Sequence, residues 1–126
     1  MQRQMLKSKI HRATVTDCDV DYVGSITVDT ELMAGADLLP NEQVHVWDVD
    51  TGSRFVTYVL EGEAGSGTIQ VNGAAAHLTR PGHKVIIASF AGYEAEDLDS
   101  YDPVVVHVNE RNEVTEIDSR PEVLLS

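Results

Sequence analysis

Turn-forming residues divide this chain into short apolar segments, and that spacing restricts it to a small β fold. Segments typical of strands are expected at residues 3–16, 20–23, 25–28, 44–49, 54–60, 68–71, 85–90, 104–108 and 113–117. Turns such as Asp50–Ser53 and Asn72-Gly73 separate them. Many short strands with turns at roughly 8- to 12-residue intervals indicate an all-β barrel or sandwich. We favour a small closed barrel, because few of these strands have the features of exposed edges.

Helical structure is expected only in short pieces. Asp29 or Thr30 can cap a helix over residues 31–34, since both side chains accept hydrogen bonds from free backbone N–H groups. Residues 74–77 are predicted to form a single helical turn, and residues 94–101 a loop or a short helix. The chain therefore belongs in the mainly β class.

Composition and charge restrict the classes of binding partner that we expect for this chain. At 126 residues the chain is expected to be one domain. Its formal net charge of −12 disfavours nucleic acid and anionic membranes, which both select basic surfaces. No apolar run has the length of a membrane span and the N-terminus lacks a signal peptide, so we expect a cytoplasmic protein. The single cysteine, Cys18, and five scattered histidines give no metal-ligand spacing, so no metal site is expected.

Two pairs of residues could carry chemistry. Strand alternation over residues 3–16 puts Lys9, His11 and Ala13 on one face. Arg54 and Tyr58 share a face of another predicted strand, and Thr57 faces the other way. Arginine can bind a carboxylate with two hydrogen bonds, and the tyrosine hydroxyl can donate a proton. On periodicity alone, however, Arg54 and Tyr58 are ordinary half-exposed strand residues.

The stretch Tyr22-Val23-Gly24-Ser25 gains meaning from its surroundings, because a Gly-Ser pair alone usually marks a turn. Five pieces stand in a fixed order: Lys9-x-His11, Tyr22-x-Gly24-Ser25, Gly52-x-Arg54-Phe55-x-Thr57-Tyr58, Gly65-Ser66-Gly67 and Asn72-Gly73-Ala74-Ala75-Ala76. Together they resemble the aspartate 1-decarboxylase family over roughly residues 3–90. The chain departs from the family at Asp48, Ala64 and His83, where Asn, Arg and Asp are usual. Beyond Phe90 we find no match.

The resemblance implies a small closed six-stranded double-psi β-barrel with short helical turns, formed by a single domain over residues 1–126. It implies a homotetramer with active sites between neighbouring subunits. It also implies self-cleavage between Gly24 and Ser25, which gives a β chain of residues 1–24 and an α chain of residues 25–126. Ser25 Oγ would attack the Gly24 carbonyl, and the α chain would keep a pyruvoyl group derived from Ser25. The family assigns further roles in cleavage to Thr57, Asn72 and His11.

The implied reaction is decarboxylation of L-aspartate to β-alanine and carbon dioxide, through a Schiff base with the pyruvoyl group, for pantothenate biosynthesis. The resemblance implies neither a metal nor pyridoxal phosphate. Lys9 and Arg54 would bind the two substrate carboxylates, and Tyr58 would protonate the α-carbon. The remaining residues expected to contact the substrate are Thr57, Gly73, Ala74 and Ala75.

Other functions remain open at this stage. A non-enzymatic or processing-defective barrel that binds a small anionic ligand would keep the strand pattern without chemistry at Ser25. A pyruvoyl enzyme with another substrate is a further alternative, although two cationic anchors, Lys9 and Arg54, fit aspartate better than a basic or apolar amino acid. The sequence leaves open whether an accessory protein activates the cleavage.

Overall fold

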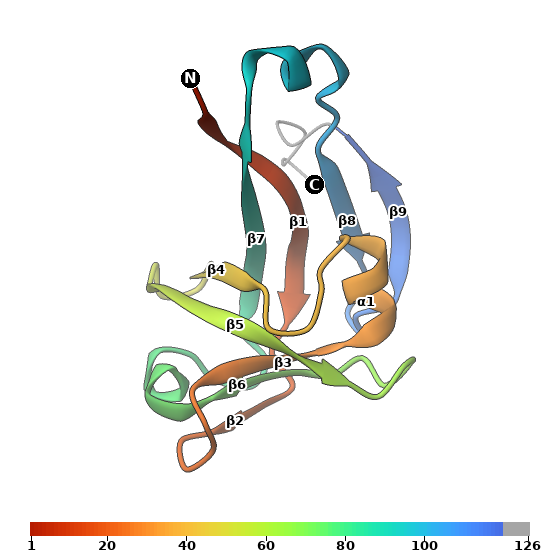
Figure 1. Ribbon diagram of the computed structural model, residues 1–126. Helices are drawn as coiled ribbons and strands as arrows, with labels where there is room; N and C mark the ends of the chain where they lie inside the picture. The colour runs from red at the N-terminus through yellow and green to blue at the C-terminus, as the bar shows by residue number, and fades with distance from the viewer. Residues whose placement is uncertain (120–126) are drawn as a thin grey trace.

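The computed structural model describes residues 1–119, and strands dominate it, as the turn spacing predicts (Figure 1). The strands are β1 (Arg3–Thr14), β2 (Asp17–Asp19), β3 (Ser25–Asp29), β4 (Gln43–Asp48), β5 (Arg54–Gly62), β6 (Ile69–Asn72), β7 (Lys84–Tyr93), β8 (Val104–Val108) and β9 (Val114–Asp118). The helical pieces are α1 (Thr30–Gly35) and the 3-10 turns η1 (Gly73–Leu78) and η2 (Ala95–Ser100). The last seven residues of the predicted domain, 120–126, lie outside the described residues.

The strands form one mixed nine-stranded sheet in the order β2-β6-β3-β5-β4-β7-β1-β8-β9. Three pairs, β1 with β8, β2 with β6 and β3 with β5, are parallel. In Figure 1, β3, β5 and β6 cross the direction of β1, β7 and β8 at a steep angle, so the sheet wraps around its own apolar face. The side chains enclosed there form one cluster, whose fully buried members include Ile10, Ile26, Val46, Val59, Ile69 and Ile87.

The segment that follows β1 links distant parts of the sheet. The Thr16 backbone N–H donates to the Ile69 carbonyl over 2.8 Å, at the start of β6. The Val15 N–H donates to the His83 carbonyl over 2.9 Å, just before β7. Consecutive residues therefore connect β6, near one end of the strand order, to β7, near its middle.

Two sequence-based expectations about the first strands are wrong. Residues 20–23 form a turn, and the strand lies earlier, at β2. The cause is Asp19, whose carboxylate accepts the Asp21 N–H over 3.0 Å and bends the chain. In β1 the alternation breaks at Arg12, which has a left-handed φ of 58° where the register with β7 shifts. Ala13 therefore joins Ile10 in the core and does not share a face with Lys9 and His11.

The predicted helix α1 is confirmed, and its cap also anchors a loop. The Asp29 carboxylate accepts the Glu31 N–H over 2.8 Å, as a helix cap does. It also accepts the N–H groups of Gly65 and Gly67 over 3.1 and 2.8 Å. These bonds hold the glycine-rich loop of residues 63–67, which follows β5, against the start of the helix. None of the helices within residues 1–119 has the length and apolar character needed to span a membrane.

Candidate active site

The Ser25 hydroxyl is buried and held by two hydrogen bonds. Ser25 begins β3, is 1% exposed, and pairs in register with Asn72 of β6. Its Oγ donates to the Val23 carbonyl over 2.7 Å and accepts from Asn72 Nδ2 over 3.0 Å. Gln70 Nε2 donates to Asn72 Oδ1 over 2.8 Å, which fixes the orientation of the amide. The hydroxyl is therefore oriented beside the peptide bond that joins Ser25 to Gly24.

The backbone before Ser25 lies against the start of η1. Gly73 has a φ of 77°, and a Cβ atom placed there would stand 2.6 Å from the Gly24 Cα and 2.9 Å from the Gly24 nitrogen. Such distances are too short for any side chain, so glycine at 73 permits the contact. On the other side the segment faces solvent, with Tyr22 and Val23 more than half exposed. The Gly24–Ser25 bond thus sits where a rigid scaffold meets an accessible turn.

Strand β5 brings two more predicted residues to this place. β3 and β5 are parallel, and Ile26 pairs with Val59. Thr57 and Tyr58 directly precede Val59 on β5, so the backbone of β5 approaches the start of β3 at these two residues. Both side chains are partly buried. The structure therefore brings Ser25 to Asn72 and Gly24 to Gly73, with Ala74 and Ala75 following in η1, and β5 carries Thr57 and Tyr58 past the start of β3.

Arg54 belongs to a second cluster. It is exposed at the start of β5, and its guanidinium carbon lies 4.8 Å from the centroid of the Trp47 ring, its register partner on β4. With Gln4, His45 and Phe90 these residues line an open depression of about 450 Å³. A guanidinium stacked on an aromatic face keeps its edge free to bind a carboxylate.

Lys9 and His11 form a third cluster on β1, which the strand order separates from β3 by β5, β4 and β7. They are only 5% and 6% exposed. Burial lowers the pKa of Lys9, and the Asp118 carboxylate opposes that shift. Burial, with smaller contributions from the charges of Lys9, His107 and Arg12, lowers the pKa of His11 to about 4. His11 is therefore a neutral imidazole near neutral pH.

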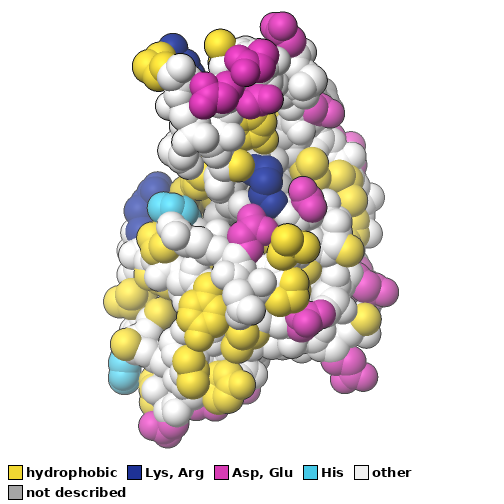
Figure 2. All heavy atoms as spheres, in the orientation of Figure 1, with side chains coloured by type: hydrophobic (Ala, Val, Ile, Leu, Met, Phe, Trp, Pro, Cys, Tyr) yellow, Lys and Arg dark blue, Asp and Glu magenta, His cyan; other side chains and the backbone are white. Residues whose placement is uncertain are grey.

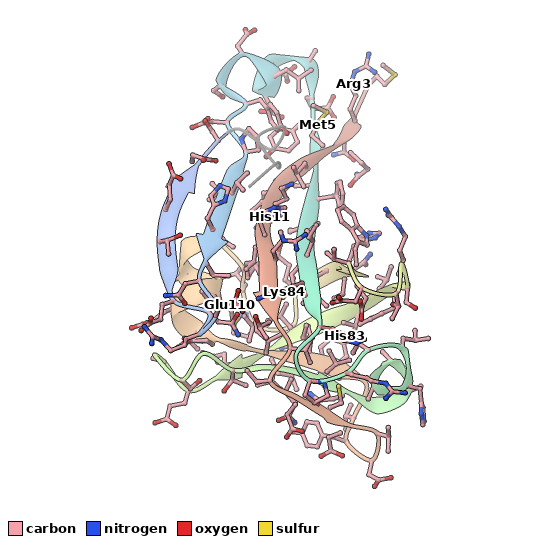
Figure 3. The ribbon with its side chains drawn as sticks, turned by 180° about the vertical axis from the view of Figure 1, so that it is seen from behind. Arg3, Met5, His11, His83, Lys84 and Glu110 are labelled. Atoms are coloured by element: carbon pink, nitrogen blue, oxygen red, sulfur yellow. The ribbon has the colours of Figure 1, made fainter. Side chains whose placement is uncertain are left out.

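Figure 3 shows His11 on β1, beside β8, with Lys84 and Glu110 further along the same side of the molecule. The pocket that His11 lines measures about 370 Å³ and also includes His107 and Glu116. The predicted site residues consequently occupy three places in one chain.

Two residues that contact these clusters, Trp47 and His107, were not among the site residues predicted from the sequence. Trp47 could have been found, because a hairpin turn at residues 50–53 sets it opposite Arg54. His107 contacts His11 because β8 runs parallel to β1, and no local pattern in the sequence reveals that pairing.

Comparisons with known proteins agree with one another. The family model described as aspartate decarboxylase matches residues 1–115. Aspartate 1-decarboxylase of Myxococcus xanthus (strain DK1622) is 54% identical over 114 residues, which are 90% of this chain and 88% of the relative. The same-named protein of Mycolicibacterium smegmatis (strain ATCC 700084 / mc(2)155) is 54% identical over 121 residues, 96% of this chain and 89% of the relative. Aspartate 1-decarboxylase 1 of Frankia casuarinae (strain DSM 45818 / CECT 9043 / HFP020203 / CcI3) is 56% identical over 119 residues, 94% of this chain and 77% of the relative. The match thus extends well beyond Phe90, where the sequence-based resemblance ended.

Proposed function

The chain belongs to the aspartate decarboxylase family, and we propose that it makes the family's pyruvoyl group from Ser25 by cutting its own backbone after Gly24. The reaction is the decarboxylation of L-aspartate to β-alanine, a step that supplies pantothenate, and it depends on the pyruvoyl group. That ketone accepts the electrons left when carbon dioxide departs, which no ordinary side chain can do. The observation that carries the assignment to Ser25 is its buried hydroxyl, held by Asn72 beside the Gly24–Ser25 bond.

The proposed self-cleavage needs only the Gly24–Ser25 peptide, the Ser25 hydroxyl and one water molecule. Ser25 Oγ bonds to the Gly24 carbonyl carbon, the Gly24–Ser25 amide bond breaks, and the nitrogen takes the hydroxyl proton, leaving an ester. Loss of the Ser25 α-proton together with cleavage of the Cβ–Oγ bond releases residues 1–24 as a carboxylate and leaves dehydroalanine at position 25. Water then replaces the nitrogen, which leaves as ammonia, and a ketone remains at the head of residues 25–126. We assign orientation of Oγ to Asn72 and polarisation of the Gly24 carbonyl to Thr57.

Substrate binding is assigned to the cations. Lys9 and Arg54 bind the two carboxylates of aspartate, and Tyr58 donates the proton to the α-carbon. Thr57 and the η1 residues Gly73, Ala74 and Ala75 line the substrate, with small side chains that let it approach the backbone.

We propose a homotetramer whose active sites lie between neighbouring subunits, because Lys9 and His11 lie strands away from Ser25 within a chain. A neighbouring subunit would supply both residues, including any assistance of His11 to the cleavage. Exposed apolar side chains support a subunit contact: Val23 is 63% exposed and Val56 on β5 is 54% exposed. Figure 2 shows hydrophobic side chains gathered on the face over β3, β5 and β6.

The finer fold belongs to the same proposal. We infer that residues 1–126 form a single domain and that the sheet closes into a six-stranded double-psi barrel. The hydrogen bonds of Val15 to His83, just before β7, and of Thr16 to Ile69 in β6, together with the enclosed core, support closure. A cytoplasmic location and activation of cleavage by a partner stay predictions.

The decisive experiment is intact mass spectrometry of the denatured protein. We expect two species, residues 1–24 and residues 25–126, the second lighter by one ammonia than a serine-headed chain. NMR of a mixture with L-aspartate should show β-alanine. The Ser25→Ala chain should stay intact and inactive, and decarboxylation by that variant would refute the proposal.

Arg54→Ala separates binding from cleavage. This variant should be cut normally, because Arg54 lies outside the Ser25 cluster, yet lose most turnover through a raised KM for aspartate. An uncut Arg54→Ala chain would mean that its role is misassigned.

A further inference from the structure

A group of polar side chains crosses three strands at the C-terminal edge of the sheet. His11 on β1 is the register partner of His107 on β8, and His107 is the partner of Glu116 on β9. The neighbouring row aligns Lys9 with Asp118 across β8. Since residues two apart on a strand share a face, these side chains lie on the same face of the three strands.

The His107–Asp118 contact fixes the ring that His11 meets. His107 Nε2 lies 3.1 Å from Asp118 Oδ2, and both side chains are 16% exposed. The rings of His107 and His11 meet edge to face, with centroids 5.8 Å apart. A carboxylate bound to one imidazole nitrogen sets the orientation of the ring. Asp118 thereby determines which edge of His107 contacts His11.

Asp118 also acts on Lys9. Desolvation lowers the pKa of the Lys9 ammonium, and the Asp118 carboxylate raises it. The titratable groups on this face include His11 on β1, His107 on β8, and Glu116 and Asp118 on β9. The pocket that His11 lines adds Arg12, Lys84 on β7 and Glu110, and the register partner of Lys9 on β7 is Ala88. Asp118 therefore helps the buried Lys9 to stay charged.

His11 is ready for a ligand. Both of its ring nitrogens are buried and have no hydrogen-bond partner among the described residues. Buried polar atoms normally find a partner, so two orphaned nitrogens on a residue that lines a pocket of about 370 Å³ point to a group that enters it. Substrate or a neighbouring subunit can supply that group.

We propose that His107 and Asp118, on the β8–β9 hairpin, are positioning residues for Lys9 and His11. Asp118 keeps Lys9 in the form that binds a carboxylate and holds His107, and the His107 ring sets the orientation of His11. The inference rests on the proposed function, because it takes Lys9 and His11 as substrate-site residues. It assigns a functional role to the β8–β9 hairpin, none of whose residues belongs to the site predicted from the sequence.

One test reads the charge of Lys9 without any catalysis. The chain has only three lysines, Lys7, Lys9 and Lys84, so NMR of protein labelled at lysine Cε can follow each one through a pH titration. We expect Asp118→Asn to lower the pKa of Lys9 and Glu113→Gln to leave it unchanged. Glu113 lies in the same hairpin connection and contacts Arg111 instead. An unchanged Lys9 in Asp118→Asn would overturn the electrostatic role.

The second test is the pH profile of aspartate decarboxylation. Asp118→Asn should raise KM about fivefold at alkaline pH, the size of one partly buried charge interaction, and move the alkaline limb of kcat/KM to lower pH. Asp118→Glu should restore most of the loss, and His107→Phe should lower kcat/KM while cleavage stays complete by mass. Profiles identical to wild type in Asp118→Asn and His107→Phe would overturn the inference.

A wild-type chain that fails to decarboxylate aspartate would instead refute the proposed function, and the lysine titration would still decide the role of Asp118.

Discussion

Ser25, Arg54 and His11 each have a neighbour that orients the side chain before any substrate arrives. Asn72 donates to the Ser25 hydroxyl, Trp47 lies under the Arg54 guanidinium, and the His107 ring contacts His11. Such support lowers the entropy that a reactive group loses when it acts. Asn72 on β6 and His107 on β8 are far in sequence from Ser25 and His11, whereas Trp47 on β4 belongs to the hairpin that also carries Arg54.

The first residue-scale prediction concerns Gly73. In Gly73→Ala the new methyl group would stand 2.6 Å from Gly24 Cα, so the segment before Ser25 must move and self-cleavage should slow at least tenfold, as expected when a reacting geometry shifts by about 1 Å. Gel analysis over time after purification measures this.

Gly52→Ala is the matched control. Gly52 has nearly the same φ, 79° against 77°, but has no atom within 4 Å of the added Cβ. It should lose about 1 kcal/mol of stability from the left-handed backbone and still cleave normally. Equal cleavage rates for the two variants would show that contact with Gly24 is unimportant.

The second residue-scale prediction concerns His11. Its pKa of about 4 lies below the ordinary 6.5, so the unfolded chain binds more protons between these values. The contribution of His11 to stability is therefore complete above pH 6.5 and falls as the pH drops toward 4, by up to about 3 kcal/mol.

Urea unfolding of wild type and His11→Phe at pH 7 and pH 4.5 isolates this contribution. The gap in stability between wild type and variant should narrow or reverse at the lower pH. The exposed His77 provides the control, and a gap for His77→Phe that changes as much would contradict the assignment.

At the scale of elements, Asn112 joins the C-terminal hairpin to the rest of the sheet. It is 2% exposed, and its Oδ1 accepts the Thr14 N–H over 2.7 Å. Its Nδ2 donates to the carbonyls of Thr14 and Gly67 over 2.8 and 2.7 Å. A turn residue thus holds the end of β1 and the glycine-rich loop, and through them the face that carries Lys9 and His11.

Asn112→Ala should lower the free energy of unfolding by about 2–3 kcal/mol, because three hydrogen bonds disappear and buried backbone groups lose their partner. The control is Asn41→Ala: Asn41 also has a left-handed φ, 72° against 60°, but is exposed. Asn41→Ala should lower the free energy of unfolding by only about 1 kcal/mol. Denaturant unfolding compares the two, and equal losses would mean that only the backbone conformation matters.

Elements proved more predictable than their pairing. The hairpin of β4 and β5 follows from the Asp50–Ser53 turn and the alternation around it, and Asp29 marks the start of α1. The local pattern gave a wrong prediction at residues 20–23. Apolar and aromatic side chains there predict a strand, but the Asp19 carboxylate binds the Asp21 N–H and forms a turn. The parallel pairings of β1 with β8 and β3 with β5 depend on the whole chain, and so does the pairing of His11 with His107.

The family motif supplied the site residues that periodicity could not separate from ordinary strand positions. Ser25 is an example, since a Gly-Ser pair normally indicates a turn, and here it begins a buried strand. The sequence could not show that Lys9 lies far from Ser25 in the chain, because their separation depends on the order of the strands in the sheet.

For the whole molecule, the acidic charge and the division of the site are connected. A net charge of −12 repels an anionic substrate, so binding requires cations close together. Lys9 and Arg54 lie in different clusters of the chain, with Lys9 buried and Arg54 exposed. Assembly that brings the Arg54 of a subunit to the Lys9 of its neighbour would concentrate positive charge only in the oligomer.

This arrangement predicts complementation. Lys9→Ala and Arg54→Ala should each be nearly inactive alone, but coexpressed chains should form mixed oligomers in which some sites receive both cations. With random assembly of equal amounts, about a quarter of the sites are complete, so activity should recover to about a quarter of wild type. Decarboxylation by the copurified mixture measures this, with separately expressed variants mixed just before assay as the control. If both cations came from the same chain, no mixed oligomer could hold a complete site, and coexpression would leave activity at the level of the single variants.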